Sequence, residues 1–225
     1  MLKDEIVDKL KSLTNQKNIE GMARFGINSG NAFGITLPVL RNIAKEYRGN
    51  HELALELWQT GYHEARLLAV FIDDPKKLTN EQIELWVKDF DSWDIVDQTC
   101  AYLFDKFPGA YEKGFEWIER DEEFIKRAGF VIIVALSVHD KKMPDEKFEI
   151  WLDKIVEHAD DERNFVKKAI NWLLRQIGKR NFNLNISATK VALELKNSDN
   201  KSACWIGSDA YRELVSDAVQ HRLKR

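Results

Sequence analysis

A tryptophan and an aspartate four residues apart are the side chains of this sequence best placed to do chemistry. Trp93 and Asp97 lie in the segment 92–97, and on an α-helix this spacing puts them on one face, one turn apart. Asp97 should lie about 100° around the helix from Val96, at the edge of an apolar stripe. A carboxylate beside a large aromatic ring at such an edge is partly desolvated, as catalytic acids and bases often are. The alternative is an amphipathic helix whose aspartate is simply exposed.

A second feature is a long basic stretch without acidic residues. No Asp or Glu falls between Glu162 and Glu194. The basic residues of this stretch are Arg163, Lys167, Lys168, Arg175, Lys179, Arg180 and Lys190. Four residues follow helical spacing and form one stripe, namely Lys168, Trp172, Arg175 and Lys179. The stripe indicates an anionic partner, and the alternative is a solvated basic face.

Composition places the chain among globular proteins and excludes several other classes. Its 225 residues, 44% of them hydrophobic, suffice for one large domain or an elongated array with a substantial core. The two cysteines are far apart and lack metal-binding or redox spacing, and the start of the sequence lacks the apolar region of a signal peptide. Both features are typical of a reduced intracellular protein. No apolar run could span a bilayer, so we expect a cytoplasmic protein without a membrane partner. The net charge of −3 gives no general attraction to nucleic acid, and such binding must come from local asymmetry.

The pattern along the chain is helical and repetitive. Short amphipathic segments alternate with turns, and alternating β-branched strands are missing. Acidic and apolar residues precede a tryptophan at Trp58, Trp86, Trp117 and Trp151, and a second helix follows each. Such a repeat of helix pairs predicts an all-α fold, an α-solenoid superhelix formed by a single domain over residues 1–225. We expect these four tryptophans to pack in the core.

The second helices of the pairs line the concave side of such arrays. The helices expected near 92–107, 122–138 and 163–180 are second helices, and a last helix is expected near 208–223. This arrangement predicts that Trp93, Asp97, Arg127 and Trp172 converge on one concave surface of a right-handed superhelix.

Several short motifs resemble one known family, in that family's order. They are Met22-Ala23-Arg24-Phe25, Phe33-Gly34-Ile35 followed by Pro38 and Arg41, Ser92-Trp93-Asp94-Ile95-Val96-Asp97, Arg127-Ala128, and Lys168-Ala169-Ile170-Asn171-Trp172-Leu173-Leu174-Arg175. Taken together, in a helical repeat of this length, they make the chain similar to the AlkD-type DNA alkylation repair proteins. Those proteins are built from HEAT-like helix pairs.

The resemblance implies a function and assigns residues to it. The family removes cationic N3- and N7-alkylated purines from duplex DNA without flipping the base, in contrast to most enzymes that act on bases. By this resemblance Asp97 is the catalytic aspartate, Trp93 and Trp172 are the two indoles of the DNA-facing cleft, and Arg127 contacts the backbone beside the lesion. The residues expected to bind DNA are Arg41, Lys167, Lys168, Arg175 and Lys179. We expect neither metal nor cofactor, a monomer, and alkylated duplex DNA as the partner.

The chain departs from the family pattern in three places. A single Trp93 stands where the family often has two adjacent tryptophans, and Phe25 stands where it can carry Tyr. Ala203-Cys204-Trp205 occupies the place of a basic pair. The five histidines are scattered and are expected at the surface. Two alternatives to a glycosylase stay open, a non-catalytic solenoid that binds damaged or branched DNA and a HEAT-type scaffold for another protein.

Overall fold

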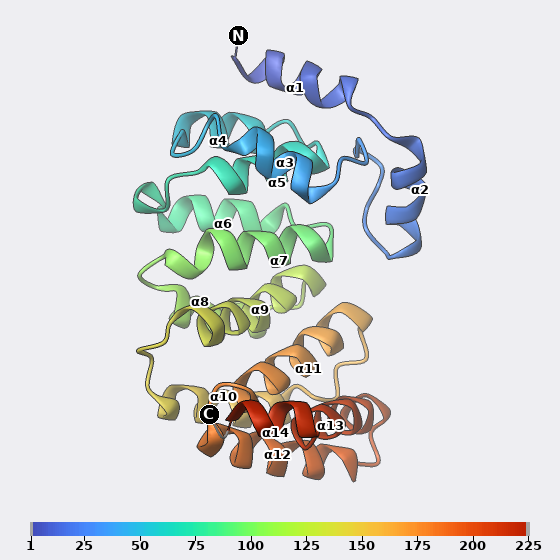
Figure 1. Ribbon diagram of the computed structural model, residues 1–225, viewed down its shortest axis with the longest axis vertical. Helices are drawn as coiled ribbons and strands as arrows, with labels where there is room; N and C mark the ends of the chain where they lie inside the picture. The colour runs from blue at the N-terminus through green and yellow to red at the C-terminus, as the bar shows by residue number, and fades with distance from the viewer. Residues whose placement is uncertain (1, 224–225) are drawn as a thin grey trace. The chain divides into compact units, whose positions relative to one another are not determined.

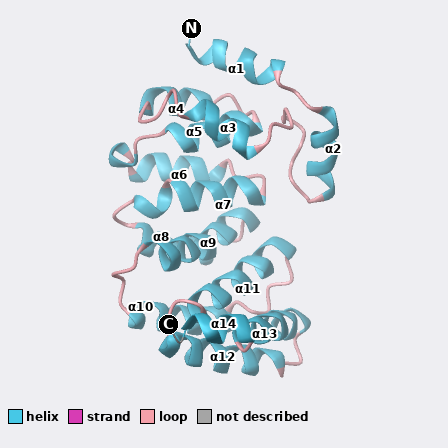
Figure 2. Cartoon of the chain, viewed as in Figure 1, coloured by secondary structure: helices cyan, strands magenta, loops and turns pink. Residues whose placement is uncertain are grey.

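Every regular element of the protein is helical in the computed structural model, which describes residues 2–223 (Figures 1 and 2). The α-helices are α1 Leu2–Ser12, α2 Gln16–Arg24, α3 Leu37–Ala44, α4 His51–Trp58, α5 His63–Ile72, α6 Asn80–Lys88, α7 Trp93–Tyr102, α8 Ala110–Ile118, α9 Glu123–His139, α10 Asp145–Glu157, α11 Asn164–Gly178, α12 Phe182–Lys196, α13 Lys201–Leu214 and α14 Asp217–Leu223. Two 3₁₀ turns, η1 Pro75–Lys77 and η2 Phe104–Lys106, complete the set. The expected all-α class is confirmed, and within residues 2–223 none of the helices has the length and apolarity to cross a bilayer.

The chain divides into two compact units, the first ending at Ala110 and the second beginning at Tyr111. In each unit most of the helices are stacked in layers, and in the first unit α2 stands apart from this stack (Figure 1). A single array over residues 1–225, and the handedness of its superhelix, stay predictions.

In the first unit, paired helices bury the tryptophans that mark the repeat. α4 packs on α5, and α5 packs on α3 and α7. Trp58 and Trp86 are 2% and 4% exposed, and their rings stack with centroids 3.9 Å apart and an interplanar angle of 5°. The predicted core position of these side chains is confirmed.

A buried glutamate fixes the segment that joins α2 to α3. Glu64 is fully buried, and its carboxylate accepts three backbone N–H bonds, from Phe33 at 2.7 Å, Gly34 at 2.6 Å and Ile35 at 3.1 Å. Gly34 has a φ of +72°, and a Cβ there would lie 2.4 Å from the carbonyl oxygen of Asn15, so only glycine fits. These bonds attach the α2 region to α5 and hence to the core of the unit.

In the second unit, α11 lies between two helices of the same layer. It packs on α9 and on α13, while α10 packs on α12 in the other layer. Trp117 and Trp151 are 1% and 0% exposed, again as predicted. Because α11 lies between α9 and α13, the side chains of those two helices determine the electrostatic surroundings of its exposed residues.

Two of the helices predicted from the sequence differ clearly from the observed ones. The predicted helix over 92–107 ends at Tyr102, because the chain turns through η2 and buries Phe104 against Trp86 and Phe90. The predicted helix over 208–223 is wrong at its start and in its continuity, although its end matches the end of α14. α13 begins at Lys201, capped by Asn200 whose side chain accepts the N–H of Ala203 at 2.9 Å, and it stops at Leu214 before α14.

Candidate active site and DNA-binding surface

The first turn of α7 carries the predicted catalytic pair. Ser92 has the extended backbone of an N-cap, with φ −156° and ψ 140°, and the helix begins at Trp93. Val96 and Cys100 are fully buried, whereas Trp93 and Asp97 are half-buried. Asp97 therefore lies at the edge of the apolar face, where helical spacing predicts it. A carboxylate there keeps access to a ligand while losing part of its hydration.

Trp93 is oriented by the segment that follows α2. Its indole Nε1–H donates to the carbonyl oxygen of Phe25 at 3.1 Å. The Phe25 ring itself is 73% exposed and borders a pocket of about 570 Å³. Lys17 and Arg24 of α2 line the same pocket. With the N–H of Trp93 engaged by protein, only the faces and edge of its ring remain for a ligand.

Arg41 of α3 is directed toward the same helix. Its Nη2 donates to Oε1 of Gln98 at 3.2 Å, and its guanidinium lies 5.5 Å and 4.9 Å from the ring centroids of Phe71 and Tyr102. Arg41 is nevertheless exposed. Contact with two aromatic rings restrains the guanidinium without neutralising its charge, so it can still meet a phosphate.

A histidine–aspartate pair lies beneath the first turn of α7. His63 Nε2 is 2.9 Å from Oδ2 of Asp94, and the hydroxyl of Ser92 donates to Asp94 Oδ1 at 2.5 Å. Burial opposes both charges, but the mutual hydrogen bond and attraction dominate, so the pKa of Asp94 is lowered and that of His63 raised. The expectation that every histidine lies at the surface is wrong for His63, which is 5% exposed. No pattern in the sequence around His63 indicates that its partner, Asp94, lies 31 residues away.

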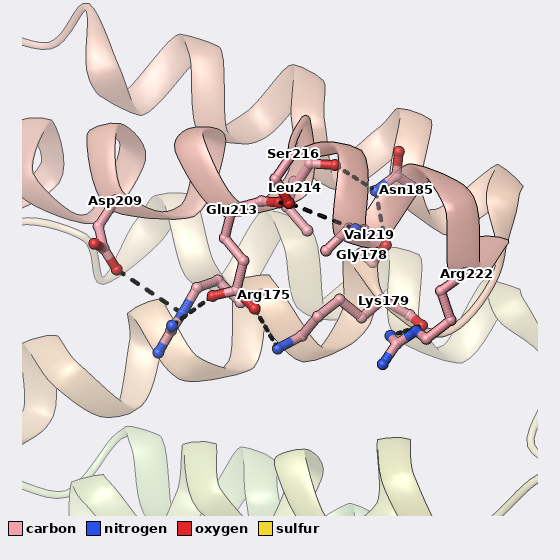
Figure 3. Close-up of polar contacts among 10 residues, drawn as sticks. All are labelled: Arg175, Gly178, Lys179, Asn185, Asp209, Glu213, Leu214, Ser216, Val219 and Arg222. Carbon is pink, nitrogen blue, oxygen red and sulfur yellow. Dashed lines mark hydrogen bonds and ion pairs between the residues drawn. The ribbon is translucent and has the colours of Figure 1, made fainter.

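The basic stripe of α11 meets acidic side chains of α13. Arg175 Nη1 and Lys179 Nζ each lie 2.6 Å from a carboxylate oxygen of Glu213, and Arg175 Nε lies 3.9 Å from Asp209 (Figure 3). Burial raises the pKa of Glu213, but the hydrogen bonds from Lys179 and Arg175 more than offset this and the net shift is downward. A stretch free of acids in the sequence is therefore not a surface free of acids.

The other residues of the stripe have different surroundings. Lys168 is exposed, and no ion pair engages it within residues 2–223. The ammonium of Lys167 lies 5.3 Å from the ring centroid of Trp205, a side chain that is 41% exposed on α13. Trp205 thus holds a lysine at one of the positions where the chain departs from the family pattern. Trp172 is half-buried on the same face as Lys168, one turn later.

Arg127 is the most enclosed of the predicted residues. It lies on α9, is 5% exposed, and donates from Nη1 to the carbonyl oxygen of Phe165 at 2.6 Å. Phe165 belongs to the first turn of α11, so Arg127 joins α9 to the helix that carries the basic stripe. Its predicted contact with a DNA phosphate stays a prediction.

The structure thus sorts the sequence-predicted residues into two groups. The first unit holds Trp93, Asp97 and Arg41 near the start of α7, and the second holds Arg127 and the α11 residues Lys167, Lys168, Trp172, Arg175 and Lys179. Convergence of the two groups on one surface stays a prediction. Sequence reasoning missed Lys17 and Arg24 as pocket residues, although their i, i+7 spacing on one helix could have suggested a shared face.

Comparison with known proteins identifies the family. The sequence model described as DNA alkylation repair enzyme matches residues 6–213, a range that includes every residue of both groups. The chain belongs to this family. Among relatives of this DNA alkylation repair family member, the uncharacterized protein Lmo0209 of Listeria monocytogenes is 26% identical over 222 residues, covering 97% of this chain and 94% of that protein. The uncharacterized protein Lin0241 of Listeria innocua is 26% identical over 193 residues, covering 84% of each chain.

A solved structure supports the fold. It is reported as "A new family of proteins related to the HEAT-like repeat DNA glycosylases with affinity for branched DNA structures". The family member described here matches it with a TM-score of 0.79 and 21% sequence identity, over 94% of this chain and 95% of the other. The likeness confirms a HEAT-like repeat fold.

Proposed function

We propose that this DNA alkylation repair family member is a monofunctional DNA glycosylase that releases cationic N3- or N7-alkylated purines from duplex DNA without flipping the base. The observation that carries the proposal is the half-buried position of Asp97, one helical turn after Trp93 at the start of α7. A carboxylate at the edge of an apolar face, beside an indole held in place by its own N–H, is suited to stabilise a cation.

The chemistry needs an anion more than an acid. Alkylation at N3 or N7 leaves the purine positively charged and weakens its glycosidic bond. When that bond breaks, its electron pair goes to the base, which becomes neutral, and the deoxyribose takes on oxocarbenium character. An ionised Asp97 near C1′ would stabilise this cation and orient the water that adds to C1′, taking up the proton that the water loses. No cofactor is required by this sequence of bond changes.

Other residues of the two groups would position the duplex. The rings of Trp93 and Trp172 offer apolar and π surfaces to the sugar and to a cationic base. Arg41 and Lys168 are exposed cations and would contact phosphates, which fix the register of the strand. Arg127, whose guanidinium donates to the Phe165 carbonyl oxygen, would also contact a phosphate.

A second candidate function is binding of branched DNA without catalysis. It is favoured by the structural likeness to a protein described as having affinity for branched DNA structures. Asp97 distinguishes the two candidates, because a phosphate-binding surface gains nothing from a carboxylate.

The deciding experiment measures base release under single-turnover conditions. The substrates are duplexes with one 7-methylguanine or one 3-methyladenine, with spontaneous loss subtracted, and binding to a four-way junction is measured in parallel. A glycosylase releases the base and loses this activity in Asp97→Asn. Tight junction binding without release from either duplex would overturn the glycosylase and favour the second candidate.

A further inference from the structure

One buried charged pair links the start of α5 to the first turn of α7. His63, the first residue of α5, meets Asp94, the second residue of α7, and Asp94 also accepts the hydroxyl of Ser92. We propose that His63 is a positioning residue whose imidazolium holds Asp94, and through it the turn that carries Trp93 and Asp97. The expected effect on base release rests on the proposed function, whereas the expected effect on the position of the first turn of α7 does not.

Asp94 lies between the two residues that it would position. It follows Trp93 directly and precedes Asp97 by three residues, so a change in its placement rotates or frays the turn that presents both. The Ser92 side chain makes no hydrogen bond to the helix backbone. The side-chain bonds of Asp94 instead tie this first turn to Ser92 and to the start of α5.

The other side of the pair is firmly anchored. The backbone N–H of His63 donates to the carbonyl oxygen of Asn31 at 3.0 Å, and the neighbouring Glu64 binds the three N–H groups of residues 33–35. The ring Nδ1 of His63 is buried and has no hydrogen-bond partner within residues 2–223. Within residues 2–223 the side-chain hydrogen bond of the imidazole therefore goes to Asp94, and the backbone bonds of His63 and Glu64 anchor the start of α5.

The charge of the ring matters as much as its hydrogen bond. Burial lowers the pKa of the His63 ring, but the hydrogen bond and charge of Asp94, together with the charges of Glu64 and Asp91, outweigh burial and raise this pKa. A protonated ring compensates Asp94. Once His63 loses its proton, an uncompensated buried carboxylate remains one turn before Asp97, and like charges at this spacing repel.

The chain offers a matched control. His51 Nδ1 lies 2.7 Å from Oδ1 of Asp73, whose other oxygen accepts a hydrogen bond from Gln82 at 2.7 Å. This pair also joins the start of a helix to an aspartate, in the same unit, but it contacts no residue of α7 in the hydrogen bonds above. His51→Gln therefore removes a comparable pair without touching the proposed site.

The test compares wild type, His63→Gln and His51→Gln from about pH 6 to about pH 9. At the acidic end we expect His63→Gln to release 7-methylguanine about tenfold more slowly with DNA affinity near that of wild type, since a misplaced carboxylate costs rate more than binding. The wild-type rate should fall as pH rises through the folded-state pKa of His63, while His63→Gln lacks this transition and His51→Gln keeps it. Equal slowing in both variants would overturn the proposal.

A second readout does not depend on activity. The indole N–H resonance of Trp93, assigned by Trp93→Phe, should shift with the same midpoint as the His63 ring resonances in wild type, and should not titrate in His63→Gln. A Trp93 signal indifferent to His63 would overturn the proposal. If wild type released no base but this coupling were seen, the proposed glycosylase would fail while the positioning role stood.

Discussion

The start of α7 and the exposed face of α11 both carry charges that the sequence relates to DNA, but the fold compensates them differently. At α7 the compensation is beneath the surface, where His63 neutralises Asp94, and Asp97 stays half-buried at the edge. At α11 it is in the surface, where Glu213 and Asp209 meet Arg175 and Lys179. A buried pair orders a site from beneath the surface, whereas a surface pair competes directly with a phosphate for the same cations.

The largest effect is expected at Asp97. Asp97→Asn keeps the shape but removes the charge that would face the oxocarbenium ion, so base release should slow by on the order of a hundredfold or more. DNA affinity should stay the same or rise, because a carboxylate repels phosphate. Single-turnover rates and binding curves on a 7-methylguanine duplex measure both. Glu81→Gln, an exposed acid at the start of α6, is the control and should change neither. An unchanged rate in Asp97→Asn would remove the catalytic role of the α7 region.

A smaller effect is expected at Trp172. Its half-buried ring would act through contact area, so Trp172→Ala should weaken both DNA binding and base release, each by about tenfold. Phe182→Ala removes a ring that is 52% exposed at the start of α12, in the other layer, and should leave both unchanged. Loss of rate without loss of affinity would indicate that Trp172 acts on the chemistry rather than on binding.

The salt dependence of DNA binding tests whether the surface ion pairs of α11 compete with phosphate. From the sequence alone, Arg175→Ala should lower the magnitude of the log–log salt slope by roughly one. The Glu213 pair leads us to expect a clearly smaller change for Arg175→Ala than for Lys168→Ala, which should lower it by about 0.9. Glu213→Gln should tighten binding and steepen the slope. If Arg175→Ala and Lys168→Ala changed the salt slope equally, DNA would displace Glu213 at no cost. If binding by the wild type did not depend on salt, the partner would be a protein.

The smallest effect is on stability at acid pH. The folded-state pKa of Glu213 is lowered, so its pairing stabilises the fold above the unfolded value near 4.5 and this contribution is lost as pH falls through the folded pKa. Because the Glu213 side chain is 30% exposed, the contribution should not exceed about 1 kcal/mol. Urea unfolding of wild type and Glu213→Gln should differ at neutral pH and agree in acid. A difference that persists in acid would assign the effect to packing instead of charge.

Much of the fold could be predicted from local pattern. The repeated tryptophans indicated helix pairs and their own burial, and the four-residue spacing placed Trp93 and Asp97 on one face with Val96 inside. The start of α13 could not be predicted, because its Gly207 weakens the helical pattern. That glycine is required by the neighbouring helix, since a Cβ would lie 2.2 Å from the backbone nitrogen of Lys196. Close approach of α12 decides this position, and it is a contact between helices.

The sequence by itself determined the helical class, the periodic core and which residues share a helix face, because these depend on neighbours within one or two turns. It also carried the motifs that relate the chain to its family. Only the tertiary structure decided which charges are compensated. Glu213 reaches Arg175 across 38 residues and Asp94 reaches His63 across 31. Electrostatic partners are set by distance in space, and helices that stack side by side bring together charges that no local pattern connects.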